Sequence, residues 1–385
     1  MLSVVELGRR QSLNEWLAIA SAELRTIRRL ARTWVIVALA AGLVGSAFYF
    51  HSYSHHSFPG SVSRINLLPR FAWADINNYV LWLFMAAVVF LAFDTRHRDE
   101  QSGIREALDS RPVSNLKVFA GRLCGVAVAT LAALFSVSVL LQVAATACGA
   151  IGWAVYPIEP VAMLTFLVVD AVPALVAWCA VVLLLVAVLG NRLIVAITAL
   201  ALLGLHMWAQ AHVPMYLLPA VSLLHIHDNW ASDLAPRFAD AQTYLHRGSL
   251  LLVAGGLLVW TAALHGRSDG VSRSRRGLCG GLLVVLGFGG IATVALRCID
   301  DLELRAAWLA AHQRSQNVPI PVMRHVRCVV HINPGRELDL DLEMQLIAPP
   351  DADLPNLAFS FNPGLDVTAL RVDDEATPFT PEPGR

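Results

Sequence analysis

The residues of this sequence that could do chemistry are few, and two of them lie inside long apolar stretches. Asp170 is about eight residues into one stretch, with Pro173 one helical turn later. A carboxylate at membrane depth costs about 2.5–3.5 kcal/mol, so it usually faces a cavity or a partner; alternatively, Asp170 reaches the membrane interface or caps a kink opened by Pro173. His206, in another stretch, fits either a hydrogen-bonded contact between helices or a proton relay. Asp170 and His206 are therefore the candidates for lining a translocation pathway.

Two groups of histidines have side chains that could bind copper or zinc. They are His51, His55 and His56, and the group His225, His227 and Asp228. Neither group contains a cysteine or paired carboxylates, so we expect polar loop residues and no metal site. The sequence also lacks the Gly-x-x-x-x-Gly-Lys-Ser/Thr phosphate loop and the His-Glu-x-x-His zinc-peptidase motif. We therefore expect no catalytic residue, no enzyme activity and no cofactor in this chain.

The composition indicates the elements that hold these residues. Of 385 residues, 56% are hydrophobic and 15% are charged, with 29 basic and 29 acidic side chains. A soluble domain has about 25% charged residues, so we exclude a disordered chain, a nucleic-acid binder held by basic charge and an ordinary cytosolic enzyme. The fold class we expect is an all-α polytopic membrane protein with six or seven transmembrane helices and a small β-rich segment outside the cytoplasm. The expected spans are Thr33–Phe50, Asn77–Phe93, Gly121–Ile151, Ala162–Leu189, Arg192–Gln210, Ser249–His265 and Gly277–Leu296.

The distribution of basic residues predicts the orientation of these spans. With the N-terminus in the cytoplasm, 17 lysines and arginines fall in cytoplasmic segments and 4 in outer loops, namely Arg64, Arg70, Arg237 and Arg247. The positive-inside rule therefore places the N-terminus inside. Seven spans then place the C-terminal tail outside, whereas six would place it inside.

The residues before the first span predict an amphipathic helix over Ser12–Arg32. Ser12 and Glu15 have the spacing of a capping box. One side is apolar, and the other carries arginines at helical spacing, so the helix is expected to lie in the headgroup layer. The residues assigned to the membrane interface are Trp16, Arg25, Arg28, Arg29 and Arg32. The alternative is a plain basic stretch that only sets the topology.

The C-terminal tail has a different pattern. Leu338–Leu346 alternates apolar and polar residues, which predicts a half-buried strand, and Val326–Ile332 predicts the strand before it. Leu357–Phe361 and Leu365–Val372 predict two more strands. The expected division of the chain is an interfacial helix over 1–32, a transmembrane domain over 33–296, a linker over 297–323 and a β-rich segment over 324–385, an incomplete β-sandwich.

The loop between the second and third spans carries dense mixed charge and ends at Pro112. It predicts either a short charged helix or a plain charged loop, and Ser114 can cap the span that follows. The loop resembles the first cytoplasmic loop of ABC-2 type transporter permeases. The matching residues are Arg98, Glu100, Gly103, Glu106, Leu108, Ser110, Pro112, Val113, Ser114, Gly121 and Arg122.

The resemblance covers roughly residues 12–265 and implies that this loop is a coupling helix that contacts a separate ATPase subunit. It assigns that contact to Arg98, Glu100, Gly103, Arg105, Glu106, Asp109 and Pro112, with ATP and Mg²⁺ on the partner. Val213–Leu224 occupies the place of the family's re-entrant element. The family further implies a homodimer or heterodimer of permease subunits in contact with lipid in the bacterial cytoplasmic membrane, acting in export.

The tail resembles the opening β-strands of M1-type aminopeptidases, through Leu338–Leu346, Leu357–Leu365 and Val367–Asp374. Because the zinc motif is absent, the resemblance implies only the non-catalytic start of that module. Two alternatives to the exporter follow from the sequence. One is a membrane anchor that presents a peptidase-like or peptide-binding module, and the other is a secondary transporter that depends on Asp170.

Overall fold

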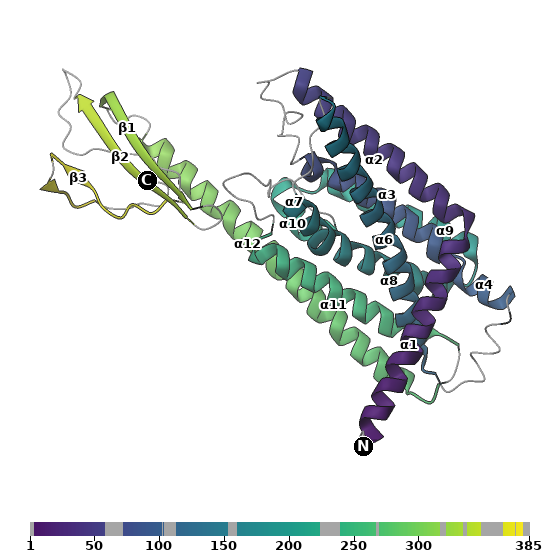
Figure 1. Ribbon diagram of the computed structural model, residues 1–385. Coiled ribbons are helices and arrows are strands. Elements are labelled where there is room, and N and C mark those ends of the chain that lie inside the picture. The colour runs from purple at the N-terminus through teal and green to yellow at the C-terminus, as the bar shows by residue number, and fades with distance from the viewer. Residues whose placement is uncertain are drawn as a thin grey trace. The chain divides into compact units, whose positions relative to one another are not determined.

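The structure is a computed structural model that describes residues 4–57, 72–101, 103, 113–152, 160–223, 239–266, 269–315, 321–333, 337–347, 365–373 and 375–379. Its helices are α1 (Val4–Arg29), α2 (Ala31–Ser57), α3 (Ala72–Ala92), α4 (Thr95–Gln101), α6 (Asn115–Ala150), α7 (Pro160–Thr165), the π-helix η3 (Phe166–Ala171), α8 (Val172–Leu189), α9 (Arg192–His212), the 3-10 helix η4 (Met215–Leu217), α10 (Leu218–Val221), α11 (Ala241–Leu264) and α12 (Arg273–Ser315). The strands are β1 (Val322–Asn333), β2 (Glu337–Ile347), β3 (Arg371–Val372) and β4 (Glu375–Ala376). Figure 1 shows their order along the chain. The chain divides into two compact units, Met1–Val294 and Ala295–Arg385.

Seven helical stretches among the described residues are long and apolar enough to cross a membrane, which agrees with the seven expected spans. They are Ala31–Phe50, Tyr79–Gln101, Asn115–Ala150, Pro160–Leu189, Arg192–His212, Ala241–Leu264 and Arg273–Gln313. Their outward faces carry many exposed leucines, valines and phenylalanines. A soluble protein rarely exposes apolar surface of this extent, so these helices are consistent with a multi-pass membrane protein.

The core of the first unit is formed around α3 and α8. α8 packs against α3, α6, α9 and α11, and most of its side chains are buried. Leu81, Phe84, Met85 and Val88 of α3 are fully buried in the same cluster. These two helices are apolar around most of their circumference, which is typical of helices surrounded by other helices.

The N-terminal helix is longer than the sequence predicted. α1 begins at Val4, so Ser12 lies within the helix and the predicted capping box does not mark its start. α1 ends at Arg29, and the chain bends at Leu30 before α2 (Figure 1). Thr33 and Trp34 donate side-chain hydrogen bonds to the carbonyl oxygens of Ile27 and Arg28 at 2.6 and 3.0 Å. These bonds satisfy carbonyl groups that the end of a helix leaves without partners.

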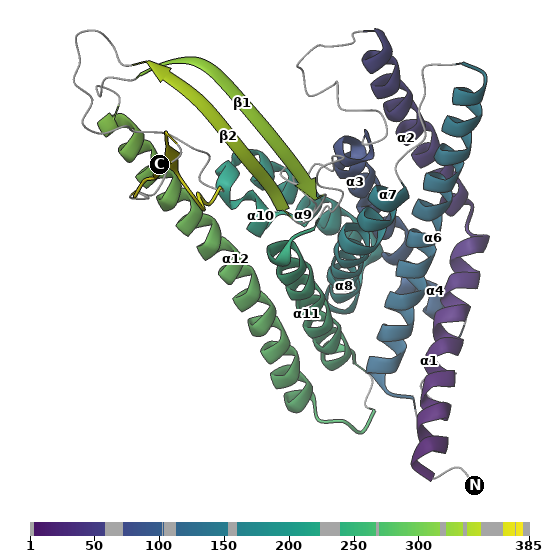
Figure 2. The same cartoon turned by 60° about the vertical axis from the view of Figure 1, so that its left-hand side comes forward.

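α1 packs along the first half of α6, and the two helices run in the same direction (Figure 2). The contact is close because α6 carries Gly121 and Gly125, four residues apart. A Cβ atom at Gly121 would lie 2.7 Å from Cγ2 of Ile19, and one at Gly125 would lie 2.9 Å from the carbonyl oxygen of Ala20. This is the small-residue packing by which membrane helices bring their backbones together.

Glycines also bring α11 and α12 together. Cβ atoms at Gly256 and Gly287 would lie 2.7 Å from the carbonyl oxygens of Gly280 and Ser249. The indole N–H of Trp260 donates to the carbonyl oxygen of Gly277 at 3.0 Å. α12 continues to Ser315, so residues 297–315 of the expected linker are helical and continue the seventh span.

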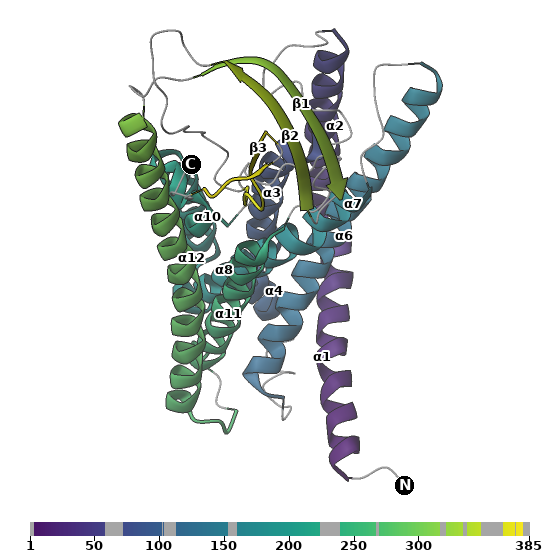
Figure 3. The same cartoon turned by 90° about the vertical axis from the view of Figure 1, so that its left-hand side faces the viewer.

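The second unit contains a long antiparallel hairpin, in which β1 and β2 follow one another as a curved ribbon (Figure 3). The two strands occur where the sequence predicted them, with Val330 opposite Leu340 and Cys328 opposite Leu342. The prediction of a half-buried strand is wrong, because no second layer among the described residues covers these side chains and nearly all are exposed. The strand predicted over 365–372 is limited to Arg371–Val372, and Leu357–Phe361 lies outside the described residues.

Candidate functional site

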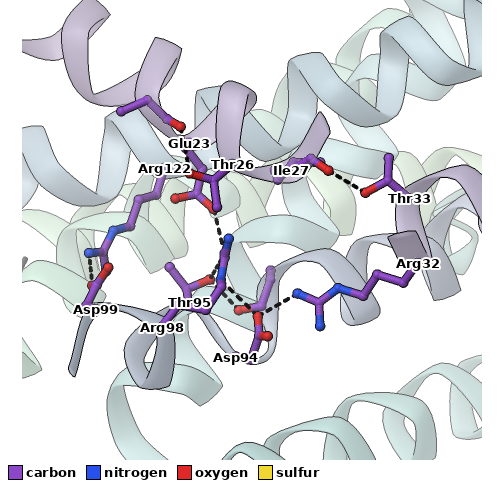
Figure 4. A network of polar contacts seen from close by, with 12 residues as sticks. Glu23, Thr26, Ile27, Arg32, Thr33, Asp94, Thr95, Arg98, Asp99 and Arg122 are labelled. Atoms are coloured by element: carbon purple, nitrogen blue, oxygen red, sulfur yellow. Dashed lines mark hydrogen bonds and ion pairs between the residues drawn. The ribbon is translucent and has the colours of Figure 1, made fainter. Parts of the chain in front are cut away.

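The densest charged cluster in the described residues lies where α1, α2, α4 and α6 meet. α4 follows α3 after a two-residue turn, and the Thr95 hydroxyl donates to the carbonyl oxygen of Ala92 at 2.5 Å. This bond fixes the turn, because it satisfies a carbonyl group near the end of α3. The short helix that results directs Arg98 and Asp99 toward the bundle (Figure 4). We call the cluster of ion pairs around α4 the α4 network.

Arg98 lies at the centre of the α4 network, between Glu23 of α1 and Asp94 at the start of α4 (Figure 4). Its guanidinium is 2.7 Å from the Glu23 carboxylate and 3.1 Å from the Asp94 carboxylate. Arg32, in the first turn of α2, pairs with the same Asp94 oxygen at 2.8 Å. The Arg32 guanidinium also lies over the ring of Phe93, 5.2 Å from its centre. Two cations therefore share Asp94, which connects α2 to α4 at one carboxylate.

Two more ion pairs extend the α4 network to α6. Arg122 of α6 pairs with Asp99 of α4, and Lys117 of α6 pairs with Glu15 of α1 at 2.9 Å. The Arg122 side chain is buried and also lies over the ring of Phe119. Buried ion pairs interact strongly because little water screens them, but removing one partner leaves a charge uncompensated. The network therefore joins α4 firmly to α1, α2 and the first turns of α6.

The structure separates the residues that the sequence assigned to a partner ATPase. Arg98 is 17% exposed and faces the bundle, whereas Glu100 is exposed and pairs with Arg96 of the same helix at 3.3 Å. Gly103 is exposed, with φ of +68°. The remaining four residues, Arg105, Glu106, Asp109 and Pro112, lie outside the described residues.

The residues assigned to the membrane interface divide in the same way. The basic residues Arg25, Arg28 and Arg29 are exposed on the side of α1 that faces away from α6. Trp16 is half-buried on the side that contacts α6, and Arg32 belongs to the α4 network. The helix is therefore amphipathic, as expected, but its apolar face packs against α6 instead of facing the headgroup layer.

A second group of charged contacts, around Asp269, connects the start of α6 to the loop between α11 and α12. One carboxylate oxygen of Asp269 accepts hydrogen bonds from the backbone N–H of Asn115 at 2.7 Å and from Arg276. Burial alone would raise the pKa of Asp269, but the bonds from Arg276 and from the N–H groups of Asn115 and Val271 outweigh it and lower that pKa to about 2. Ser114 accepts from the N–H of Lys117, as the predicted cap of this helix.

We expect Asp269→Asn to lower the free energy of unfolding by about 2 kcal/mol at neutral pH, because it weakens hydrogen bonds to a charged acceptor. The pKa of Asp269 is lower in the folded state than in the unfolded state, so its stabilisation is complete above about pH 4 and is lost as the pH falls through about 2. The melting temperatures of wild type and variant in detergent should therefore differ by a constant amount between pH 5 and 8 and converge below pH 4. Asp300→Asn is the control, because Asp300 is exposed. It should change neither the melting temperature nor its dependence on pH. A difference that already closes between pH 7 and 5 would contradict this assignment.

The two residues expected in a translocation pathway lie near a short segment after α9. Asp170, in η3, pairs with Arg247 of α11 at 2.9 Å, and both side chains are buried. His206 of α9 contacts the Gln210 amide at 3.3 Å and accepts from the N–H of Leu223 at 3.4 Å. Asp170 is thus a buried carboxylate with a partner, and His206 contacts its own helix and the segment that follows α10.

Arg247 is the residue that sequence reasoning missed. Its position before the expected sixth span placed it in an outer loop, but α11 begins at Ala241 and Arg247 lies well inside the helix. The polar residues of the first turns lower the local hydropathy, which displaced the predicted boundary. The available signal was the carboxylate at Asp170, because a buried charge requires a partner of opposite sign.

The side chains of both histidine groups lie outside the part of the chain that the structure describes. His51, His55 and His56 lie in α2, and the group His225–Asp228 lies outside the described residues. Within the part of the chain that the structure describes, no three histidine, cysteine or acidic side chains are grouped so that they could hold a metal ion.

A scan against protein-family models finds no match to this chain, and a search of curated proteins finds no similar sequence. The geometry of the α4 network and the sequence resemblance therefore support the function proposed below.

Proposed function

We propose that this chain is the membrane-spanning permease subunit of an ABC-2 type transporter, an ATP-driven exporter that works as a dimer with separate ATPase subunits. The observation that supports this proposal is the α4 network. α4 is short and charged, and its inward side chains are joined to three other helices by ion pairs. A partner that pushes on the exposed side of α4 would therefore move α1, α2 and α6 together.

The arrangement fits the transmission of force better than it fits a solvated loop. A loop that only connects two spans does not need its charges buried, and burial of charge is costly unless geometry compensates it. In the α4 network, Arg98 and Asp94 each make more than one ionic contact. Networks of packed side chains and ion pairs of this kind carry coupling between distant sites.

The proposed orientation places this end of the bundle in the cytoplasm of a bacterial cell and the tail outside. The positive-inside rule is its support, since 17 of the 21 basic residues outside the tail lie before the first span, between Arg96 and Arg122, at Arg192, or between Arg267 and Arg276.

The proposal predicts that the chain, purified with affinity resin from cells that express it naturally, is accompanied by a protein with a Gly-x-x-x-x-Gly-Lys-Ser/Thr motif. Mass spectrometry identifies that protein, and ATP hydrolysis by the complex confirms its activity. Reversing the exposed charge with Glu100→Arg should lower its recovery about tenfold, because a like charge would face the partner surface that Glu100 contacts.

Glu303→Arg is the matched control, because Glu303 is an exposed glutamate on α12, outside the α4 segment. It should leave recovery unchanged. The proposal would be overturned if the wild-type chain recovered no such ATPase from a membrane extract prepared under conditions that preserve membrane-protein complexes. Equal recovery with Glu100→Arg would remove Glu100 from the contact.

A further inference from the structure

Side chains from α9 and α11 hold in place the short segment that follows α9. η4 and α10 form a short turn of helix after Pro214, and Pro219 lies within it. Ala220 and Ser222 of this segment are buried. Because helices this short are marginal without tertiary contacts, the side chains that hold the segment decide whether it stays docked.

Arg247 makes the central contacts to this segment. It donates to the carbonyl oxygen of Leu223 at 2.9 Å and to that of Ser222 at 3.5 Å, and its other terminal nitrogen donates to Asp170 at 2.9 Å. The neighbouring residue His246 contacts the carbonyl oxygen of Ala220 at 3.1 Å. Side chains of α11 thus bind three carbonyl groups of the segment, those of Ala220, Ser222 and Leu223.

α9 holds the same segment from another side. The Gln210 amide donates to the Ser222 hydroxyl at 2.5 Å, and the N–H of Leu223 points to His206. Backbone groups buried in an apolar bundle need such partners, since an unsatisfied one costs several kcal/mol at membrane depth. The contacts of Arg247 can be kept only while Asp170 holds the guanidinium, because an unpaired buried cation is unstable.

Asp170 lies in a part of its span that departs from the regular α-helix. Phe166–Ala171 is a π-helix, in which the N–H of Val172 donates to the carbonyl oxygen of Leu167. π-helical turns are frequent at functional sites, and Pro173, the second residue after this one, removes a further backbone donor. The position of the Asp170 carboxylate therefore depends on a turn that is not held by the regular α-helical bonds.

The opposite end of the same span touches α4. α8 ends at Gly190, which has φ of +68°, and the guanidinium of Arg96 lies against it, 3.2 Å from where a Cβ atom would be. The eighteen residues of α8 form a rod of about 27 Å between Gly190 and the π-helix. α8 is well packed along this length, and its Trp178 donates to the carbonyl oxygen of Met85 at 2.9 Å.

We propose that the Asp170–Arg247 pair is a releasable latch that keeps the segment Met215–Leu223 docked, and that α8 is the lever through which movement of α4 reaches it. The lever role depends on the proposed function, whereas the latch does not. When α8 moves, the π-helical turn carries Asp170 away from Arg247. Arg247 then loses its counter-ion, and its hold on the carbonyl groups of Ser222 and Leu223 weakens. Arg247 is in this sense a positioning residue for the transport step.

The latch is tested by the reactivity of a cysteine placed on the segment. Ala220→Cys is introduced into the full chain with its native cysteines replaced, and the purified protein is treated with N-ethylmaleimide in detergent without any ATPase. We expect slow labelling at position 220, and labelling at least about tenfold faster when Asp170→Asn is added. A cysteine at Ala199, which is fully buried in α9, is the control and should stay protected in both backgrounds.

A second variant removes the pair without leaving a buried charge. Asp170→Leu combined with Arg247→Met keeps the interior apolar, a kind of change that buried ion pairs often tolerate. The latch predicts fast labelling at position 220 and protection at position 199 in this variant as well. Labelling at the wild-type rate in this folded double variant would overturn the proposal. Equal exposure of both cysteines in both variants would also overturn it, because the pair would then stabilise the whole bundle. Since neither outcome involves an ATPase, failure of the latch is distinct from failure of the permease assignment.

Discussion

Replacing Gly125 with leucine should separate α1 from α6 and release the α4 network. A Cβ atom at this position would lie 2.7 Å from Cβ of Glu23 and 2.9 Å from the carbonyl oxygen of Ala20. A backbone carbonyl cannot move aside alone, so the two helices must part. Overpacking a close contact typically costs 1–3 kcal/mol, and we expect about 3 kcal/mol for this site. Glu23 would move with α1, so the Arg98–Glu23 pair would break as well.

Limited trypsin digestion measures the separation. α1 carries Arg25, Arg28 and Arg29, which are exposed but protected by the helical backbone. A loss of about 3 kcal/mol in local stability should speed cleavage after these arginines about 100-fold. Gly42→Leu is the matched control, because Gly42 also lies in a helix but no atom is within 4 Å of its Cβ position. Cleavage of Gly125→Leu at the rate of the control would show that the glycine contact does not hold α1.

The sequence was informative where one helix determines its own features. The seven spans follow from hydropathy, and the Ser114 cap follows from residue type. The errors occur where polar residues belong to a helix. The start of α11, with His246 and Arg247, and the length of α1 before Ser12 were missed, because charge and polarity were interpreted as the end of a helix.

The candidate site could be predicted only in part, because its contacts join residues far apart in the chain. Charge density marked the segment around α4, but nothing local distinguishes the inward Arg98 from the outward Arg96. That difference arises from which face of α4 meets Glu23, 75 residues earlier. The partner of Asp170 is 77 residues away, so its existence was predictable from the cost of a buried charge but its identity was not.

Replacing Arg98 with methionine should destabilise the protein far more than the same change at Arg96, two residues earlier. Arg98 is 17% exposed and its acidic partner Glu23 is 11% exposed, whereas Arg96 and its partner Glu100 are 43% and 41% exposed. Removing one member of a buried pair costs about 3–5 kcal/mol, and the remaining exposure of Arg98 brings the expected loss to about 3 kcal/mol. An exposed pair contributes about 0–1 kcal/mol, which is the loss expected at Arg96.

The comparison is made by unfolding the purified variants under identical detergent conditions. Arg98→Met leaves the Glu23 carboxylate without its cation, so the double variant Arg98→Met with Glu23→Met should recover most of the loss. Recovery would show that the loss comes from the uncompensated carboxylate and not from missing contacts of the arginine side chain. Equal losses at Arg96 and Arg98 would contradict the inward assignment of Arg98. If Arg98→Met is destabilising and the double variant recovers the lost stability, the residues of the α4 network stabilise the fold together. A segment that transmits force to α1, α2 and α6 must have this property.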